Sequence, residues 1–144
     1  MKNQILLLVA LFICTATFAQ KDELKAAEKA VKKNDYAAAA AEVGKAEALI
    51  AGADDKTKAK FYYLKGKAYY AGGEATSEDL DVVISSFDEL GKVEKEMGST
   101  KYSEEAKSVI EAIIIKVDKD ARAAYGVAQE TKDIGKYKES AAGF

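Results

Sequence analysis

Two stretches about a hundred residues apart repeat one pattern of residue types. NDYAAAAAEVGKA runs from Asn34 to Ala46, and GKYKESAAGF runs from Gly135 to Phe144. In each, a turn-forming residue precedes a tyrosine, and a small residue and then a bulky apolar residue follow at the same intervals. The matching pairs are Tyr36 and Tyr137, Ala39 and Ser140, and Val43 and Phe144. Such recurrence predicts stacked copies of one unit, because a single copy cannot bury its apolar face alone.

The composition predicts an all-α fold. The chain has no proline and is rich in Ala, Lys and Glu, which are good helix formers. Apolar residues recur at three- and four-residue spacing, which is the period of a helix. We expect six helices, at about 21–33, 36–50, 55–71, 77–97, 103–132 and from 136 onward.

Turn and capping residues separate these helices. Asp35 and Asp54 are placed to cap the helices that follow them, and Thr76-x-x-Asp79 resembles a capping box. Gly52 is expected to end the second helix.

The sequence predicts an apolar face on the fourth helix and another on the fifth. The predicted apolar face of the fourth helix consists of Leu80, Val83, Ile84, Phe87, Leu90 and Met97. The predicted stripe of the fifth helix consists of Ala106, Val109, Ile113, Val117, Ala121, Ala124 and Ala128. The run Ile113–Ile115 widens that stripe, so we expect one of these isoleucines to meet a neighbouring helix on a second side.

The first nineteen residues have the features of a secretory signal peptide. Lys2 is followed by an apolar run from Ile5 to Ile13 and by small residues before a cleavage site between Ala19 and Gln20. The run is shorter than the roughly twenty residues that span a bilayer. We therefore expect export to the periplasm or the exterior and no stable membrane span after cleavage. The lack of cysteine after the signal and of an Asn-x-Ser/Thr sequon favours a bacterial context.

Composition argues against several chemistries. There is no histidine to move protons near neutrality, and the lone cysteine, Cys14, lies inside the predicted signal next to Ile13, where a lipoprotein signal needs a small residue. The formal net charge is −2 and Arg122 is the only arginine, which argues against nucleic-acid binding. No acidic cluster has the spacing of a calcium loop. We expect neither an enzyme nor a cofactor or metal site.

The helix pairs resemble tetratricopeptide repeats. In that family a small residue in the first helix of each unit lets the second helix approach closely. The resemblance places these small residues at Ala27, Gly66 and Ala128, in units of roughly 20–53, 59–97 and 103–144 within one domain, 20–144. It implies a helical solenoid that holds a protein or a peptide.

The chain departs from the family pattern. The three small residues are not evenly spaced at the family's period, and no proline closes a unit. An ordinary helical bundle would show similar spacing. The stop at Phe144 leads us to expect either a longer repeat protein or an end covered by another chain, and the first is favoured.

The resemblance also implies a concave groove lined by the first helix of each unit. Its side chains lie six and three places before the small residue and one and four after it. The second unit contributes Lys60, Tyr63, Lys67 and Tyr70, and the third Arg122, Tyr125, Gln129 and Lys132; in the first unit the positions are Lys21, Leu24, Glu28 and Val31.

Lysines attract carboxylates, and tyrosines give rigid contact area, so we expect an acidic peptide or a C-terminal carboxylate as partner. The alternatives are packing tyrosines with solvated lysines, self-association through the long helix, or, ranked lower without tryptophan, glycan binding.

Overall fold

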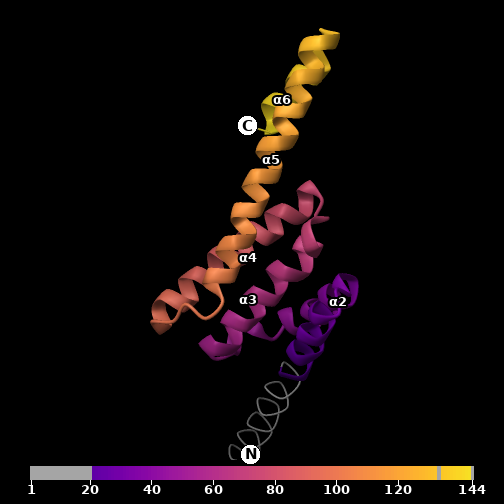
Figure 1. Cartoon of the computed structure of the whole chain (residues 1–144). Helices are drawn as coiled ribbons and strands as arrows, with labels where there is room; N and C mark the ends of the chain where they lie inside the picture. Colours follow the sequence, from indigo (N-terminus) through magenta and orange to yellow (C-terminus); the bar gives the residue numbers. More distant parts are fainter. Residues whose placement is uncertain (1–20, 133, 144) are drawn as a thin grey trace, which may run out of the picture. The chain divides into compact units, whose positions relative to one another are not determined.

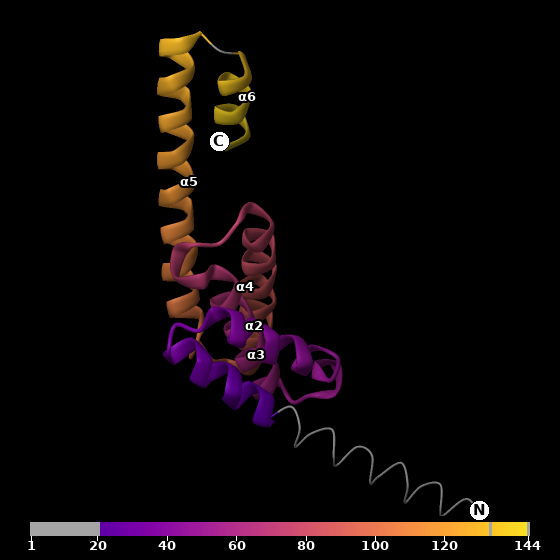
Figure 2. The same cartoon turned by 90° about the vertical axis from the view of Figure 1, so that its right-hand side faces the viewer.

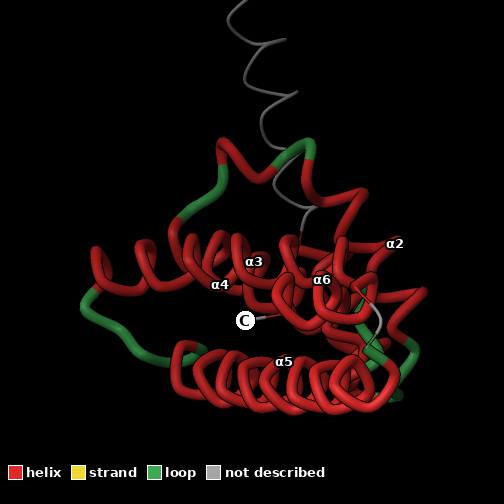
Figure 3. The backbone as a smooth tube through the Cα atoms, turned by 90° about the horizontal axis from the view of Figure 1, so that it is seen from above, coloured by secondary structure: helices red, strands yellow, loops and turns green. Residues whose placement is uncertain are grey.

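The computed structural model describes residues 21–132 and 134–143, and every regular element within them is helical (Figures 1 and 3). The first helix spans residues 21–32. It is followed by α2 (Tyr36–Glu47), a 3-10 turn η1 (Ile50–Gly52), α3 (Asp55–Tyr70), a second 3-10 turn η2 (Ala71–Gly73), α4 (Ser77–Met97), α5 (Ser103–Thr131) and α6 (Ile134–Gly143). The predicted all-α class is confirmed, and the predicted signal, 1–19, lies outside the described residues.

The chain forms two compact units, Met1–Ala106 and Lys107–Phe144, which are described separately. The boundary lies within α5, one turn after its start. The first unit therefore contains the α4–α5 loop and the first turn of α5.

The predicted caps are confirmed. The carboxylate of Asp35 accepts the amide of Ala38 at 3.1 Å, and that of Asp54 accepts the amide of Thr57 at 2.8 Å. Thr76 and Asp79 form a reciprocal capping box at the start of α4. These bonds satisfy amides that have no partner within their own helix, so each helix starts where its capping residue lies.

Two left-handed turns bring Tyr36 of the repeated pattern into place. Asn34 takes a φ of 57°, a conformation that asparagine tolerates, and accepts a hydrogen bond from the Tyr36 hydroxyl. The turn after α3 contains Gly72 at φ 68°, where an added Cβ would lie 3.0 Å from the Tyr36 hydroxyl oxygen. The tyrosine thus covers a turn whose positive φ and limited space both favour glycine.

The core of the first unit joins the first helix, α2, η1 and α3. Its members are Leu24, Ala27, Val43, Ala46, Ile50, Ala53, Phe61 and Leu64. The pair α3 and α4 packs closely at Gly66, where an added Cβ would overlap the ring of Phe87. Ala27 and Gly66 are both buried, as expected for positions where a second helix approaches.

In the second unit, α6 runs antiparallel to α5 (Figure 2). The Ser140 hydroxyl donates to the carbonyl of Ala121 at 3.0 Å, and the rings of Tyr125 and Tyr137 meet edge to face at 6.0 Å. Ser140 is 2% exposed and its counterpart in the repeated pattern, Ala39, is 0% exposed. The repeated small residue therefore fills a tight position in both units; the third predicted small residue, Ala128, is also buried.

Several sequence expectations were wrong in detail. Helix α2 ends at Glu47, not at Ile50, which belongs to η1. The left-handed residue before α6 is Lys132, whereas Gly135 lies inside that helix.

The isoleucines also differ from expectation. Ile84 is 51% exposed, and within the predicted run Ile113 is buried while Ile114 and Ile115 are 61% and 69% exposed. Each residue turns a helix by about 100°, which carries Ile114 and Ile115 away from the buried stripe. The stripe itself is buried or partly buried throughout, as predicted.

We expect Gly66→Ala to lower the free energy of unfolding by about 1–3 kcal/mol, because the new methyl group forces Phe87 to move. Gly91→Ala is the matched control on α4, where an added Cβ meets nothing within 4 Å. It should stabilise the protein by about 0.5–1 kcal/mol through helix propensity. Thermal and urea unfolding of both variants would test this, and two stabilising substitutions would refute the close approach at Gly66.

Candidate functional site

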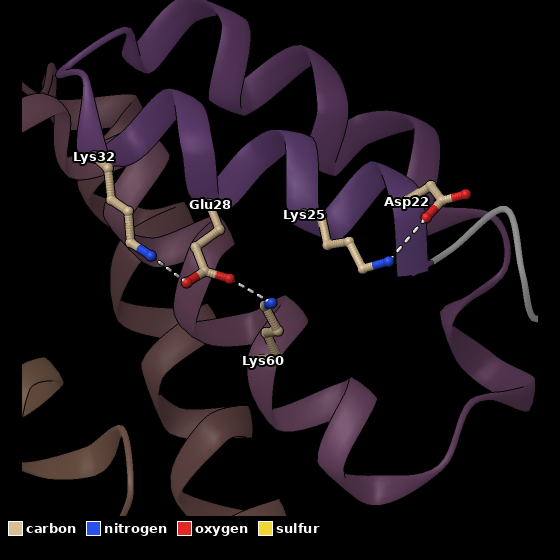
Figure 4. A network of polar contacts seen from close by, with 5 residues as sticks. All are labelled: Asp22, Lys25, Glu28, Lys32 and Lys60. Carbon is tan, nitrogen blue, oxygen red and sulfur yellow. Dashed lines mark hydrogen bonds and ion pairs between the residues drawn. The ribbon is translucent and has the colours of Figure 1, made fainter.

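The predicted groove face of α3 lies against the first helix. Lys60 pairs with Glu28 across the two helices at 2.5 Å, and Lys32 approaches the other oxygen of the same carboxylate at 2.7 Å (Figure 4). Farther along the first helix, Lys25 pairs with Asp22 at 3.2 Å. The hydrogen bonds from Lys32 and Lys60 lower the pKa of Glu28 to about 2. Lys60, a predicted groove cation, is thus largely neutralised by its neighbour.

The next two groove residues on α3 bind the first turn of α5. The Tyr63 hydroxyl donates to Glu105 at 2.7 Å, and Lys67 donates to the other oxygen of that carboxylate at 2.8 Å. Lys67 first, and then Tyr63, lower the pKa of Glu105. Burial, followed by the bond to Glu105, raises the pKa of Tyr63. Tyr63 is therefore a neutral donor held in one orientation.

Tyr70 completes the α3 set without joining this network. It is half-buried at the last turn of α3, and an added Cβ on Gly73 would lie 3.5 Å from its hydroxyl. On the first helix, Leu24 is fully buried and belongs to the core, whereas Lys21 is exposed. The structure thus brings together Lys60, Tyr63 and Lys67 and separates Tyr70 from their polar contacts.

The other four predicted groove residues belong to the second unit. Arg122 pairs with Asp118 at 2.8 Å, and the Gln129 amide donates to the Tyr125 hydroxyl at 3.0 Å. Lys132 is exposed at the left-handed turn that follows α5. The side chains of Arg122, Tyr125 and Gln129 thus make their polar contacts along α5 itself.

Glu94 is the residue of this region that the sequence pattern did not indicate. It lies on α4 and is 1% exposed. Its carboxylate accepts the amides of Tyr102 and Ser103 at 2.9 and 3.0 Å and the Ser103 hydroxyl at 2.5 Å. Tyr102 immediately precedes α5 and cannot cap it, because its side chain has no oxygen near the first amides. Glu94 therefore caps α5 from the previous helix.

This cap fixes the loop that carries Lys101 and Tyr102. The Tyr102 ring stacks on Tyr63 with centroids 4.6 Å apart and an interplanar angle of 21°. The ammonium of Lys101 lies 4.9 Å from the centre of the Tyr102 ring. Both distances are within the range of favourable aromatic and cation–π contacts.

Three cavities of about 270, 240 and 290 Å³ meet at Lys101 and Tyr102. We call them the basic cavity cluster. The first extends toward α4 at Glu94 and Met97, the second toward Glu28 and Glu105, and the third toward Lys21 and Lys25. The predicted groove residues Lys60 and Tyr63 line part of this cluster.

No protein-family model, curated protein or solved structure matches this chain. Within residues 21–132 and 134–143, no helix has the length and apolar character that crossing a bilayer requires. The same residues hold no cluster of three acidic, cysteine or histidine side chains able to bind a metal ion. The contacts of the basic cavity cluster are therefore the basis for assigning a function.

The ion pairs of Glu28 give a testable pH dependence. The folded-state pKa of Glu28, about 2, lies below its ordinary value of 4.5. The ion pairs therefore contribute fully to stability above pH 4.5, and this contribution is lost as the pH falls toward 2. NMR titration of the Glu28 carboxyl carbon should show a midpoint near 2, and Lys60→Met should move it upward. Lys45→Met, which removes a lysine paired with Glu42, should leave it unchanged.

We expect Glu94→Ala to destabilise the protein by about 2–4 kcal/mol, because it leaves buried donors at the start of α5 without an acceptor. Glu94→Gln keeps one oxygen and should cost less. Glu96→Ala, on the exposed side of the same helix, is the control and should change the unfolding free energy by less than about 0.5 kcal/mol. Equal effects of Glu94→Ala and Glu96→Ala in chemical denaturation would contradict this role.

Proposed function

We propose that this protein is a non-catalytic scaffold of the bacterial cell envelope that binds a protein or peptide in a basic and aromatic groove. The single observation that carries the proposal is the convergence of the first helix, α3 and the start of α5 on one set of cavities around Tyr102. Three chain segments distant in sequence contribute charged and aromatic side chains there, held by internal bonds. Preorganised side chains lose little entropy when a partner binds.

The proposed architecture is a series of tetratricopeptide-like helix pairs. Two features support it. The first helix of one pair faces the first helix of the next, through Lys60 with Glu28 and through Tyr63 with Glu105. The small residues that the resemblance singled out, Ala27, Gly66 and Ala128, are all buried.

The proposed location depends on the N-terminal sequence. A basic start, a short apolar run and small residues before Gln20 are typical of a cleaved export signal. The non-catalytic part of the proposal is supported by the lack of histidine in the sequence and by the position of Cys14 within that signal. No cofactor is required for a binding role of this kind.

Self-association is the second candidate, and the exposed Ile114 and Ile115 favour it. Their burial against a second copy would be stabilised by the hydrophobic effect. Light scattering separates the two candidates, since a mass that stays monomeric as concentration rises contradicts self-association. Glycan binding is disfavoured because the sequence has no tryptophan to stack on a sugar ring, and the Tyr102 ring already stacks on Tyr63.

A peptide array probed with the purified protein tests the groove. We expect selective capture of some peptides and a loss of about tenfold or more with Lys60→Glu combined with Tyr63→Ala, because both side chains line the cavities. Lys45→Glu, outside the cavities, is the charge control. Circular dichroism must show that the variants fold. Capture that is unchanged by the double substitution would rule out the groove.

A further inference from the structure

The basic cavity cluster has a charge opposite to that of the whole chain. Its lining residues include six lysines and three glutamates, a net of +3, while the complete sequence has a formal net charge of −2. The lysines are Lys21, Lys25, Lys32, Lys56, Lys60 and Lys101. A concave surface of one charge sign focuses its field on a ligand of the other sign.

The three glutamates already have partners. Glu28 is held by Lys32 and Lys60, Glu94 by the start of α5, and Glu105 by Lys67 and Tyr63. Their negative charges are therefore compensated within the fold. These glutamates line the cavities, and the lysines that do not bond to them can contact a ligand.

Three of the lining lysines stand outside these pairs. Lys21, Lys56 and Lys101 form no ion pair with any residue that the structure describes. Lys101 lies where the three cavities meet and is held over the Tyr102 ring. Asp54 and Asp55 line a different cavity beside Lys56, and the Asp54 carboxylate caps α3. The hydrogen bond from Thr57, and then the charges of Lys21 and Lys56, lower the pKa of Asp54. The positive charge that no described carboxylate offsets thus lies at Lys101, and the charges of Lys21 and Lys56 are offset in part by Asp54.

The size of the three cavities favours a peptide as the ligand. Each cavity, at about 240–290 Å³, has room for one or two side chains. Lysine ammoniums act as point charges that suit single carboxylates, whereas bidentate phosphate recognition favours arginine. The Tyr102 ring already stacks on Tyr63, which leaves it less able to stack on a base or a sugar.

We infer that the basic cavity cluster binds an acidic peptide segment, whose carboxylates contact Lys21, Lys56 and Lys101. This inference rests on the proposed function and deepens it. It assigns charge recognition to the α4–α5 loop and the ends of two helices, not to Lys60 and Lys67, whose charges are compensated by Glu28 and Glu105. Through these ion pairs, Lys60 and Lys67 hold the helices that line the cavities.

The test uses fluorescein-labelled peptides in which alanine alternates with glutamate, with glutamine or with lysine. Fluorescence anisotropy with the purified protein should show binding of the glutamate peptide at least about tenfold tighter than that of the glutamine peptide, weakening as salt rises from about 50 to 500 mM. The triple substitution Lys21→Gln, Lys56→Gln, Lys101→Gln should abolish this preference.

A matched variant separates local recognition from net charge. Lys45→Gln, Lys92→Gln and Lys95→Gln remove the same charge from α2 and α4 outside the cluster and should leave the affinity unchanged. Lys101→Gln alone should weaken binding several-fold, and Lys101→Arg should restore it, because the charge is kept. The single variants also give an answer if the triple variant does not fold.

The outcomes distinguish this inference from the proposed function. Equal binding of glutamate and glutamine peptides, or equal losses in the two triple variants, would overturn acid recognition at Lys101 while capture on the peptide array could still depend on Lys60 and Tyr63. If capture on the array does not change when Lys60 and Tyr63 are substituted, but the preference for glutamate remains, the proposed groove would be refuted. The inferred acid-binding role of the basic cavity cluster would then still stand.

Discussion

A buried carboxylate at Glu94 holds together the part of this protein on which its proposed function depends. Burying a charged carboxylate is costly unless strong hydrogen bonds compensate for the lost water, and here the amides of Tyr102 and Ser103 do so. The bonds join α4 to the start of α5 across a short loop. They fix the position of Lys101 and Tyr102, and they set the first turn of α5 so that Glu105 meets Tyr63 and Lys67.

The internal ion pairs and the unpaired lysines have different roles in this arrangement. Lys60 and Lys67 each neutralise a carboxylate on a facing segment and hold helices in register. Partly exposed pairs of this type contribute little to stability, so their main effect is on geometry. Lys101, by contrast, has an aromatic ring beneath it and no carboxylate partner among the described residues, so its charge remains available at the surface.

Much of the fold could be predicted from local sequence, because helix starts depend on short-range chemistry. The side chains of Asp35, Asp54 and Thr76 each cap a helix by accepting an amide three residues later. Helix α5 begins and ends within one residue of expectation. The burial of Gly66 followed from the repeat resemblance. The exposed Ile114 and Ile115 were misjudged because an apolar run does not reveal how far a stripe extends around a helix.

The site was harder to predict because its decisive contacts are not local. Glu94 looks like any acid in a helix rich in lysine and glutamate, and its partners lie eight and nine residues later, beyond a turn. The sequence pattern singled out Lys60 and Lys67 on α3, but it did not show that Glu28 and Glu105 would pair with them.

The cap supplied by Glu94 also gives a rule for finding distant relatives. A helix that starts after an aromatic residue lacks its own capping oxygen, so a related chain must provide an acid from the preceding helix or replace the aromatic with Ser, Thr, Asp or Asn. Loss of the acid alone would leave the amides of Tyr102 and Ser103 without a hydrogen-bond acceptor. Paired changes at these two positions would therefore be a recognisable trace of shared ancestry, even where the rest of the sequence has diverged.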